Sequence, residues 1–388
     1  MKRETYAGDS LKILQFIPAL INKTFPIPAR FRSALPSNIA ELSRLLTNNR
    51  GKRALSYMGR PNYLSAYLHY FLPWNIYRLC LLLPTLQLNF SSGDVITDIG
   101  CGPLTFTAAL WISRPEFRNI PLEFNCVDRS NPALDAGKKF FNALCSTVKE
   151  DCQWKINFIH DDIDIRKKNI TSKRKSANFV CAINMFNEVY EHLPHNNIEG
   201  LKHMANDCAK FLHNEASKDA SILTVEPGVP QSGKFISFLR TSFMELERLP
   251  SAPCTHTSVC PLLPKKGGKQ RWCHFAFDAA GAPNELRRLS AAAGLPKERL
   301  VFSFLQTGAV SNSIKPDEEE KIRVISDAFL IPRSQFGRYG CFSKGIVLLT
   351  GEKTRIDKLT SFSCINASSF NNTGVYDKKS GAVILELL

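Results

Sequence analysis

Short apolar runs rich in β-branched residues recur through the middle of the chain, and polar residues stand at or after their ends. Segments with helical periodicity separate the runs, which cover residues 95–99, 122–127, 156–160, 177–183 and 221–225. Strands that alternate with helices predict a doubly wound parallel sheet. Ligands of such sheets bind beyond the carboxyl ends of the strands, so the polar residues at these ends form the candidate site.

The first run leads into a glycine turn. Gly100 and Gly102 follow the strand, and residues 106–112 then read as a helix. Glycines at this place let a ligand approach the backbone, because no Cβ stands in the way, and the helix start offers free N–H groups. A dinucleotide site would need a third glycine, and Thr105 stands in its place. A tight strand-to-helix turn without any ligand would show the same pattern.

Acidic and amide side chains stand at the ends of four predicted strands. These are Asp98 in the first strand, Asp128 at the end of the second, Asp161 and Asp162 after the third, and Asn184 after the fourth. An acid at the tip of the second strand commonly accepts hydrogen bonds from ribose hydroxyls. We therefore expect these side chains and the two glycines to line one ligand pocket.

The regions on either side of the predicted sheet differ from it in pattern. Residues 1–90 read as helices with proline breaks, and the sheet then occupies residues 91–310. Residues 315–388 are expected to be β-rich, with candidate strands at 322–331, 345–350 and 382–388. A small barrel is one interpretation of this end, and OB-like barrels bind RNA. An extension packed on the main domain is the other.

Composition narrows the function classes. Of 388 residues, 50 are Lys or Arg and 35 are Asp or Glu, which gives a net charge of +15. Such an excess favours a polyanionic partner, most simply nucleic acid, although high charge also serves solubility. Twelve cysteines without a secretory leader favour a reducing compartment. The apolar stretch 79–88 is too short to span a bilayer, so no membrane partner is expected.

Three cysteines lie in a proline-rich loop over residues 252–275. They are spaced Cys254-x5-Cys260-x12-Cys273. A reducing compartment disfavours disulfides, and thiolates that converge in this way bind zinc or an iron–sulfur cluster. Three unrelated buried thiols are the alternative.

A closed site needs a fourth ligand. Cys341 is our choice, because it stands in a stretch that reads as a glycine-rich turn, and Cys364 is the second choice. His256 and His274 could instead complete a zinc site.

The segment Asp98-Ile-Gly-Cys-Gly-Pro103 resembles motif I of class I S-adenosylmethionine-dependent methyltransferases, and the resemblance covers about residues 90–230. It implies a Rossmann-like α/β fold in which Asp98 and the two glycines hold the methionine end of the cofactor. It also implies that Asp128 takes the ribose and that Asp161 or Asp162 meets the adenine.

A wider resemblance, over about residues 50–350, is to the methyltransferase-like family that assembles the mitochondrial small ribosomal subunit, with its bacterial relatives. Motif I carries it together with Glu226-Pro-Gly, Arg240, Cys254-x5-Cys260-Pro, Trp272-Cys273-His-Phe and Gly-Cys341. The resemblance implies S-adenosylmethionine binding and docking on small-subunit ribosomal RNA in ribosome biogenesis and translation. It further implies a four-iron four-sulfur cluster on Cys254, Cys260, Cys273 and Cys341.

No catalytic group is identified by the sequence. Residues 184–188 read Asn-Met-Phe-Asn-Glu where base N-methyltransferases carry Asn-Pro-Pro-Tyr, and no nucleophilic cysteine follows this strand. Glu188 is either a base or an acid that stabilises a helix start.

Three functions therefore stay open: an assembly factor with or without methyl transfer, an active RNA methyltransferase with no assembly role, and a zinc-stabilised RNA-binding module. We expect a monomer off the ribosome. Since no transit-like leader is visible, a bacterial cytoplasm is favoured over the mitochondrial matrix.

Overall fold

The computed structural model describes residues 2–47, 57–148, 152–165, 176–194, 196–263, 271–308, 320–332 and 335–388. The chain divides into two compact units, residues 1–192 with 277–300 and residues 193–276 with 301–388. The expected start of the β-rich region at residue 315 lies outside the described residues. The three-region division expected from the sequence stays a prediction.

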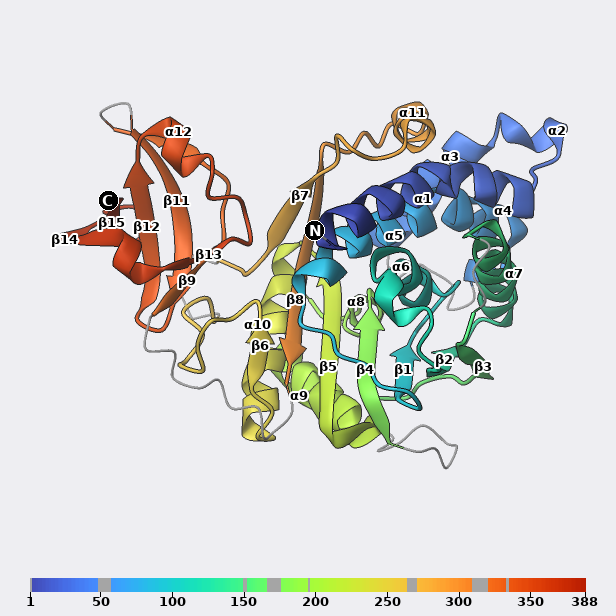
Figure 1. Cartoon of the computed structure of the whole chain (residues 1–388), viewed down its shortest axis with the longest axis horizontal. Coiled ribbons are helices and arrows are strands. Elements are labelled where there is room, and N and C mark those ends of the chain that lie inside the picture. Colours follow the sequence, from blue (N-terminus) through green and yellow to red (C-terminus); the bar gives the residue numbers. More distant parts are fainter. Residues whose placement is uncertain are drawn as a thin grey trace. The chain divides into compact units, whose positions relative to one another are not determined.

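The first unit contains a parallel sheet. Its strands are β1 (Val95–Ile99), β2 (Glu123–Asp128), β3 (Lys155–His160) and β4 (Ala177–Ile183). They lie in the order β3-β2-β1-β4, and all three pairings are parallel (Figure 1). The central strand β1 is buried along its whole length, which explains its apolar, β-branched sequence. The expected doubly wound sheet is confirmed here.

Helices make up the rest of this unit. They are α1 (Lys2–Thr24), α2 (Ala29–Arg32), α3 (Leu35–Thr47), α4 (Pro61–Ala66), a π-helical turn (Tyr67–Phe71), α5 (Leu72–Leu82), α6 (Thr105–Ser113), α7 (Asn131–Val148), α8 (Phe186–Val189) and α11 (Asn284–Ala292). Short 3₁₀ turns cover Tyr57–Gly59, Leu83–Thr85 and Pro115–Phe117. No helix within the described ranges is both long and apolar enough to cross a bilayer.

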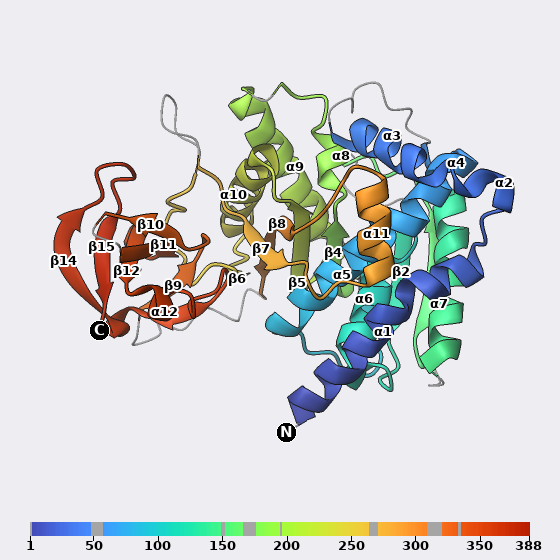
Figure 2. The ribbon, with the colours of Figure 1, turned by 90° about the horizontal axis from the view of Figure 1, so that it is seen from above.

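Helix α6, which follows the glycine turn, is enclosed on all sides. Every one of its residues is buried, as expected of a helix whose apolar residues are spread all round. Helices α1, α5 and α7 pack against it, and α1 runs beside α5, α6 and α11 (Figure 2). The N-terminal helices therefore complete the core of the first unit.

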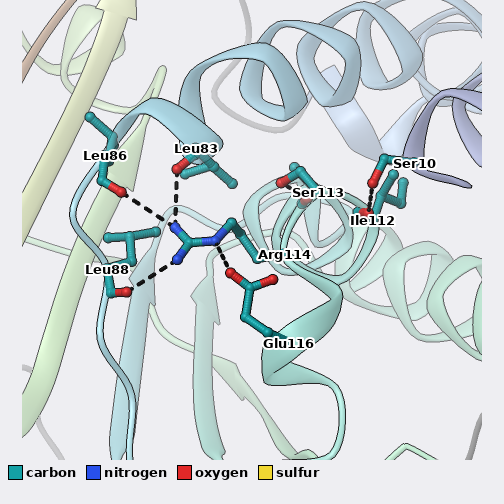
Figure 3. Close-up of polar contacts among 9 residues, drawn as sticks. Ser10, Leu83, Leu86, Leu88, Ile112, Ser113, Arg114 and Glu116 are labelled. Atoms are coloured by element: carbon teal, nitrogen blue, oxygen red, sulfur yellow. Dashed lines mark hydrogen bonds and ion pairs between the residues drawn. The ribbon is translucent and has the colours of Figure 1, made fainter. Parts of the chain in front are cut away.

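Arg114 ties the end of α6 to the segment that leads into β1. Its guanidinium donates to the carbonyl oxygens of Leu83, Leu86 and Leu88 at 3.2, 3.4 and 3.2 Å (Figure 3). Its Nε also bonds Glu116 at 2.6 Å. The arginine thus supplies a charged donor to these backbone acceptors, of which the Leu83 carbonyl also accepts from the N–H of Leu86 at 3.2 Å.

We expect Arg114→Met to lower the free energy of unfolding by about 2–4 kcal/mol, because three carbonyl groups lose a charged donor. Urea unfolding followed by tryptophan fluorescence measures this change. Lys12→Met is the control, since its ion pair with Asp9 at 3.4 Å is exposed and should contribute less than about 0.5 kcal/mol. Equal losses in the two variants would contradict the role given to Arg114.

The second unit begins with α9 (Ile198–Glu215), β5 (Ala216–Pro227), α10 (Pro230–Glu245) and β6 (Pro250–Ala252). Strand β7 (Phe275–Asp278) ends the cysteine loop, and β8 (Arg299–Thr307) follows. Strand β8 lies between β5 and β6 and is antiparallel to both. The strand orders β3-β2-β1-β4 and β5-β8-β6 are those of the two halves of a class I methyltransferase sheet, so the expected fold class is confirmed.

A separate β-sheet ends the chain. It contains β9 (Lys321–Val324), β10 (Phe329–Ile331), β11 (Gln335–Phe342), β12 (Gly345–Gly351), β13 (Cys364–Asn366), β14 (Phe370–Tyr376) and β15 (Val383–Leu387), with α12 (Lys353–Ile356). The order is β13-β9-β11-β12-β15-β14, and β10 pairs with β11. Because β13 and β14 stand at opposite ends of this order, the described strands form an open sheet, which differs from the OB-like barrel considered from the sequence.

Candidate cofactor edge and cysteine centre

The glycine turn after β1 is tied to the end of β2. The N–H groups of Gly100 and Cys101 donate to the carbonyl oxygen of Val127 at 2.8 and 3.0 Å. The N–H of Gly102 donates to Asp128 Oδ2 at 2.8 Å. Gly102 has φ of 53°, and a Cβ added there would meet nothing within 4 Å. Its surroundings are therefore open to a ligand.

Gly100 lies in a different environment. A Cβ on Gly100 would stand 2.6 Å from Met185 Cγ, and the residue has φ of 68°. Glycine is needed here to admit the Met185 side chain and to adopt this backbone conformation. The sequence analysis expected a cofactor to approach Gly100. On the side where a Cβ would stand, Met185 occupies the space instead.

Asp98 is a buried carboxyl group with one oxygen unpartnered. The residue is 1% exposed, Cys181 Sγ lies 3.4 Å from Oδ1, and Oδ2 has no hydrogen-bond partner among the described residues. Burial raises the pKa of Asp98 to about 7. An unsatisfied carboxylate oxygen in the interior is costly, so Oδ2 marks a place for a cationic or N–H donor.

Asp128 and Asp161, the first acid after β3, lie side by side at the same edge. Asp128 Oδ1 accepts from Ser130 N, and burial raises the pKa of Asp128 although its two backbone donors oppose this. A carboxylate has lone pairs to accept further donors. Asp161 is half-buried and donates its N–H to the Asp128 carbonyl, while Asp162 is exposed. The structure thus brings Asp98, Gly102, Asp128 and Asp161 to one edge.

The fifth predicted polar residue, Asn184, contacts a residue that the sequence did not single out. Asn184 follows β4 with φ of 54°, and its Oδ1 accepts from Arg78 Nη2 at 3.1 Å. Arg78 is the lone charged residue of α5. A single charged residue in an otherwise apolar helix is the feature of the sequence that could have identified Arg78.

Glu188 is held by two partners. Arg129 Nη2 lies 2.9 Å from Oε2, and the Tyr57 hydroxyl donates to Oε1 at 3.3 Å. The carboxylate therefore joins α8 to the end of β2 and to the Tyr57–Gly59 turn. This arrangement supports a structural ion pair rather than the general base considered from the sequence.

The second unit brings the predicted cysteines together. Burial is the largest cause that raises the pKa of the Cys273 thiol, and the charges of Cys254, Cys260 and Cys341 raise it further. Burial and the charges of Cys254 and Cys260 likewise raise the pKa of Cys341. The four thiols therefore lie close enough to interact, although no group of three or more His, Cys, Asp or Glu in the described residues could hold one metal ion.

Cys341 is presented by a strand, which corrects the turn expected from the sequence. It lies in β11, opposite Arg323 of β9, and Cys364 of β13 lies opposite the other side of Arg323. Cys341 Sγ is 3.7 Å from His256 Nε2. Cys341 therefore contacts a residue of the cysteine loop, and Arg323 lies between it and Cys364 across the sheet.

Two arginines hold the cysteine loop. Arg240, 3% exposed on α10, donates to the carbonyl oxygens of His256 and Ser258, both at 2.9 Å. Arg323 Nε donates to the Pro253 carbonyl at 2.8 Å. The loop backbone is thus fixed by protein contacts, and both guanidinium charges lower the pKa of Cys341.

The parallel sheet with a glycine turn after β1, and the antiparallel β8 between β5 and β6, define a class I methyltransferase-like protein. A family model described as mitochondrial small ribosomal subunit Rsm22 matches residues 89–332. The chain belongs to this family. No curated protein matches the chain.

Several solved structures are similar to this chain. A putative class I S-adenosylmethionine-dependent methyltransferase of Listeria monocytogenes is 10% identical, with 81% of this chain and 91% of that chain covered and a TM-score of 0.37. Geranyl diphosphate C-methyltransferase of Streptomyces coelicolor A3(2) is 12% identical, with 70% and 97% covered and a TM-score of 0.33. A methyltransferase of Geobacter sulfurreducens with S-adenosylhomocysteine is 11% identical, with 69% and 98% covered and a TM-score of 0.32.

Proposed function

We propose that this chain binds S-adenosylmethionine at the edge formed by Asp98, Gly102 and Asp128, and docks on small-subunit ribosomal RNA during ribosome assembly. The observation that carries the cofactor assignment is the buried Asp98 oxygen without a partner, which suits the ammonium group of the ligand. The open space at Gly102 and the remaining acceptor capacity of Asp128 support it. When bound, this cofactor supplies an electrophilic methyl group.

Ribosomal docking is supported by the family description and by charge. The matched family is that of a mitochondrial small ribosomal subunit protein, and the net charge of +15 suits a polyanionic partner. The same description favours the mitochondrial matrix over the bacterial cytoplasm that the sequence suggested.

We further propose that Cys254, Cys260, Cys273 and Cys341 hold a four-iron four-sulfur cluster. Four thiolates could also hold a single zinc ion at about 2.3 Å from each sulfur. A four-iron cluster takes one thiolate at each iron, so its ligands stand farther apart. The mutual interaction of the thiols and the two arginine contacts to their loop support a preformed centre of this kind.

Gradient sedimentation of cell extracts tests ribosomal docking. We expect the tagged chain to migrate with precursors of the small subunit and to dissociate as salt is raised, because phosphate contacts weaken with salt. A chain that stays at the top of the gradient at low salt would contradict docking. If the chain stayed at the top of the gradient and an RNA methyl mark disappeared in an Asp98→Asn strain, an RNA methyltransferase without an assembly role would be favoured.

A further inference from the structure

The short helix between α1 and α3 exposes an aromatic ring. Phe31 lies in α2 and is 52% exposed, and no residue of this helix is buried. Figure 1 and Figure 2 both show α2 at an outer end of the helices of the first unit. A single exposed apolar side chain is common on protein surfaces and needs no ligand to explain it. The charged groups next to Phe31 are what set it apart.

Arginines precede and follow Phe31 in the chain. The guanidinium carbon of Arg30 lies over the Phe31 ring, 4.7 Å from its centroid, which is the geometry of a cation–π contact. Arg32 Nε donates to the Ile27 carbonyl at 3.1 Å, and this bond uses only one of the N–H donors of the guanidinium. The exposed ring is therefore presented together with two positive charges that are held by the protein.

The surrounding segment carries no negative side chain. Residues 10–40 contain no Asp or Glu, and their basic residues are Lys12, Lys23, Arg30 and Arg32. The acid Glu285 of α11 bonds Asn22 of α1 at 2.5 Å, so it engages α1 rather than α2. A local excess of positive charge attracts a polyanion, because each neutralised phosphate releases a counterion. The charge of this segment thus favours a nucleic acid as its partner.

We propose that Arg30, Phe31 and Arg32 form a stacking platform for single-stranded RNA, in which a base stacks on Phe31 and phosphate groups bind the two arginines. This inference rests on the proposed ribosomal docking and adds the surface and the form of RNA that it binds. Every base has a flat face that can stack on an aromatic ring, but the paired bases of a duplex stack on one another and present only their edges. Phe31 therefore selects single strands, while the arginines attract either form.

Fluorescence anisotropy of the full-length chain with a labelled single-stranded RNA, and with the duplex of the same sequence, tests this assignment. We expect Phe31→Ala to weaken binding of the single strand at least about fivefold, which is the low end for loss of one base-stacking ring. Binding of the duplex should change less than about twofold. Phe31→Trp should retain the affinity for the single strand, because it keeps an aromatic face. Arg32→Gln should weaken binding of both forms and reduce its salt dependence, since it removes a phosphate contact.

Photo-cross-linking locates the contact on the protein. A single-stranded RNA that carries 5-iodouridine should form an adduct at Phe31, because stacking brings the base against the ring. Mass spectrometry of the digested protein identifies the modified residue. Adducts that all lie outside α2 would overturn the platform.

The matched control is Phe16→Ala. Phe16 is 43% exposed on α1, and its neighbour Lys12 is paired with Asp9 at 3.4 Å, so its loss should affect neither RNA. Because both phenylalanines are exposed, circular dichroism should show both alanine variants to be folded. Equal losses of single strand and duplex in Phe31→Ala would overturn the platform, as would no loss of either or an equal effect of Phe16→Ala.

The failure of the platform can be told apart from the failure of docking. A parent chain that binds neither RNA and stays at the top of the sedimentation gradient would refute the proposed docking itself. A parent chain that migrates with small-subunit precursors but binds no single-stranded RNA, or whose Phe31→Ala variant binds it unchanged, would refute only the platform. Loss of binding to anionic phospholipid vesicles in Phe31→Ala, with unchanged RNA affinity, would make this surface a membrane contact and overturn its RNA role.

Discussion

The Asp98→Asn variant will be more stable than the parent at pH 8, by about 4 kcal/mol. In the unfolded chain this carboxyl ionises near its ordinary pKa of 3.8, whereas burial raises the pKa to about 7 in the folded protein. The unfolded state therefore loses its proton first, and stability that the parent has near pH 4 is lost as pH rises toward 7. The difference in pKa corresponds to about 4 kcal/mol, and an amide does not incur it.

Urea unfolding at several values between pH 4 and pH 8 measures this effect. The gain of Asp98→Asn over the parent should grow with pH and level off above pH 7. Asp162→Asn, at an exposed position after β3, is the control and should show no such gain. A gain independent of pH would contradict the account of Asp98. The same substitution should abolish S-adenosylhomocysteine binding. Asp98 would then lower the stability of the folded protein but be required for ligand binding.

Cys341→Ser will remove most of the iron and acid-labile sulfide from the anaerobically purified protein, whereas Cys364→Ser will retain both. The two cysteines flank the same Arg323 across the sheet, so they form a matched pair. Cys341 interacts with the loop thiols Cys254 and Cys260. A cluster needs a thiolate at each iron, and removing one ligand should lower iron content at least about tenfold.

Iron and sulfide analysis and the visible absorption spectrum check this prediction, and circular dichroism checks the fold. Both variants should remain folded, because Arg240 and Arg323 hold the loop by contacts that need no metal. Stoichiometric zinc without iron in the parent would contradict the cluster and favour a zinc-stabilised module. Equal iron loss in both variants would contradict the assignment of Cys341.

The strands that form the cofactor edge could be predicted because their sequences are dominated by burial. Strand β4 spans Ala177–Ile183, as expected, and β1–β3 differ by at most one residue at each end from their expected bounds. The acids and the amide at their ends could then be placed together, since parallel strands end at one edge.

Strand β11 could not be predicted, because its glycines resemble a turn. A Cβ on Gly340 would lie 2.4 Å from Ile322 Cγ2, so glycine is needed there for close approach of β9. A sequence cannot distinguish this use of glycine from a turn. The same confusion placed Cys341 in a turn, whereas the structure places it in β11.

Arg78 escaped prediction for a different reason. It stands in an apolar helix without a motif, and its significance comes from the contact with Asn184, which is distant in sequence. The position of Met185 next to Gly100 could not be predicted either, because it depends on the turn of the backbone after β4.

The enclosure of α6 has a consequence for how this chain has evolved. The helix that starts at the glycine turn relies on α1 and α5 to shield its outer surface. An ancestral gene that lost or exchanged its first segment would have left an apolar helix facing solvent next to the ligand edge. We therefore expect the N-terminal helices and the parallel sheet of the first unit to have been inherited together. Sequence variation among relatives should be concentrated in segments that do not contact α6.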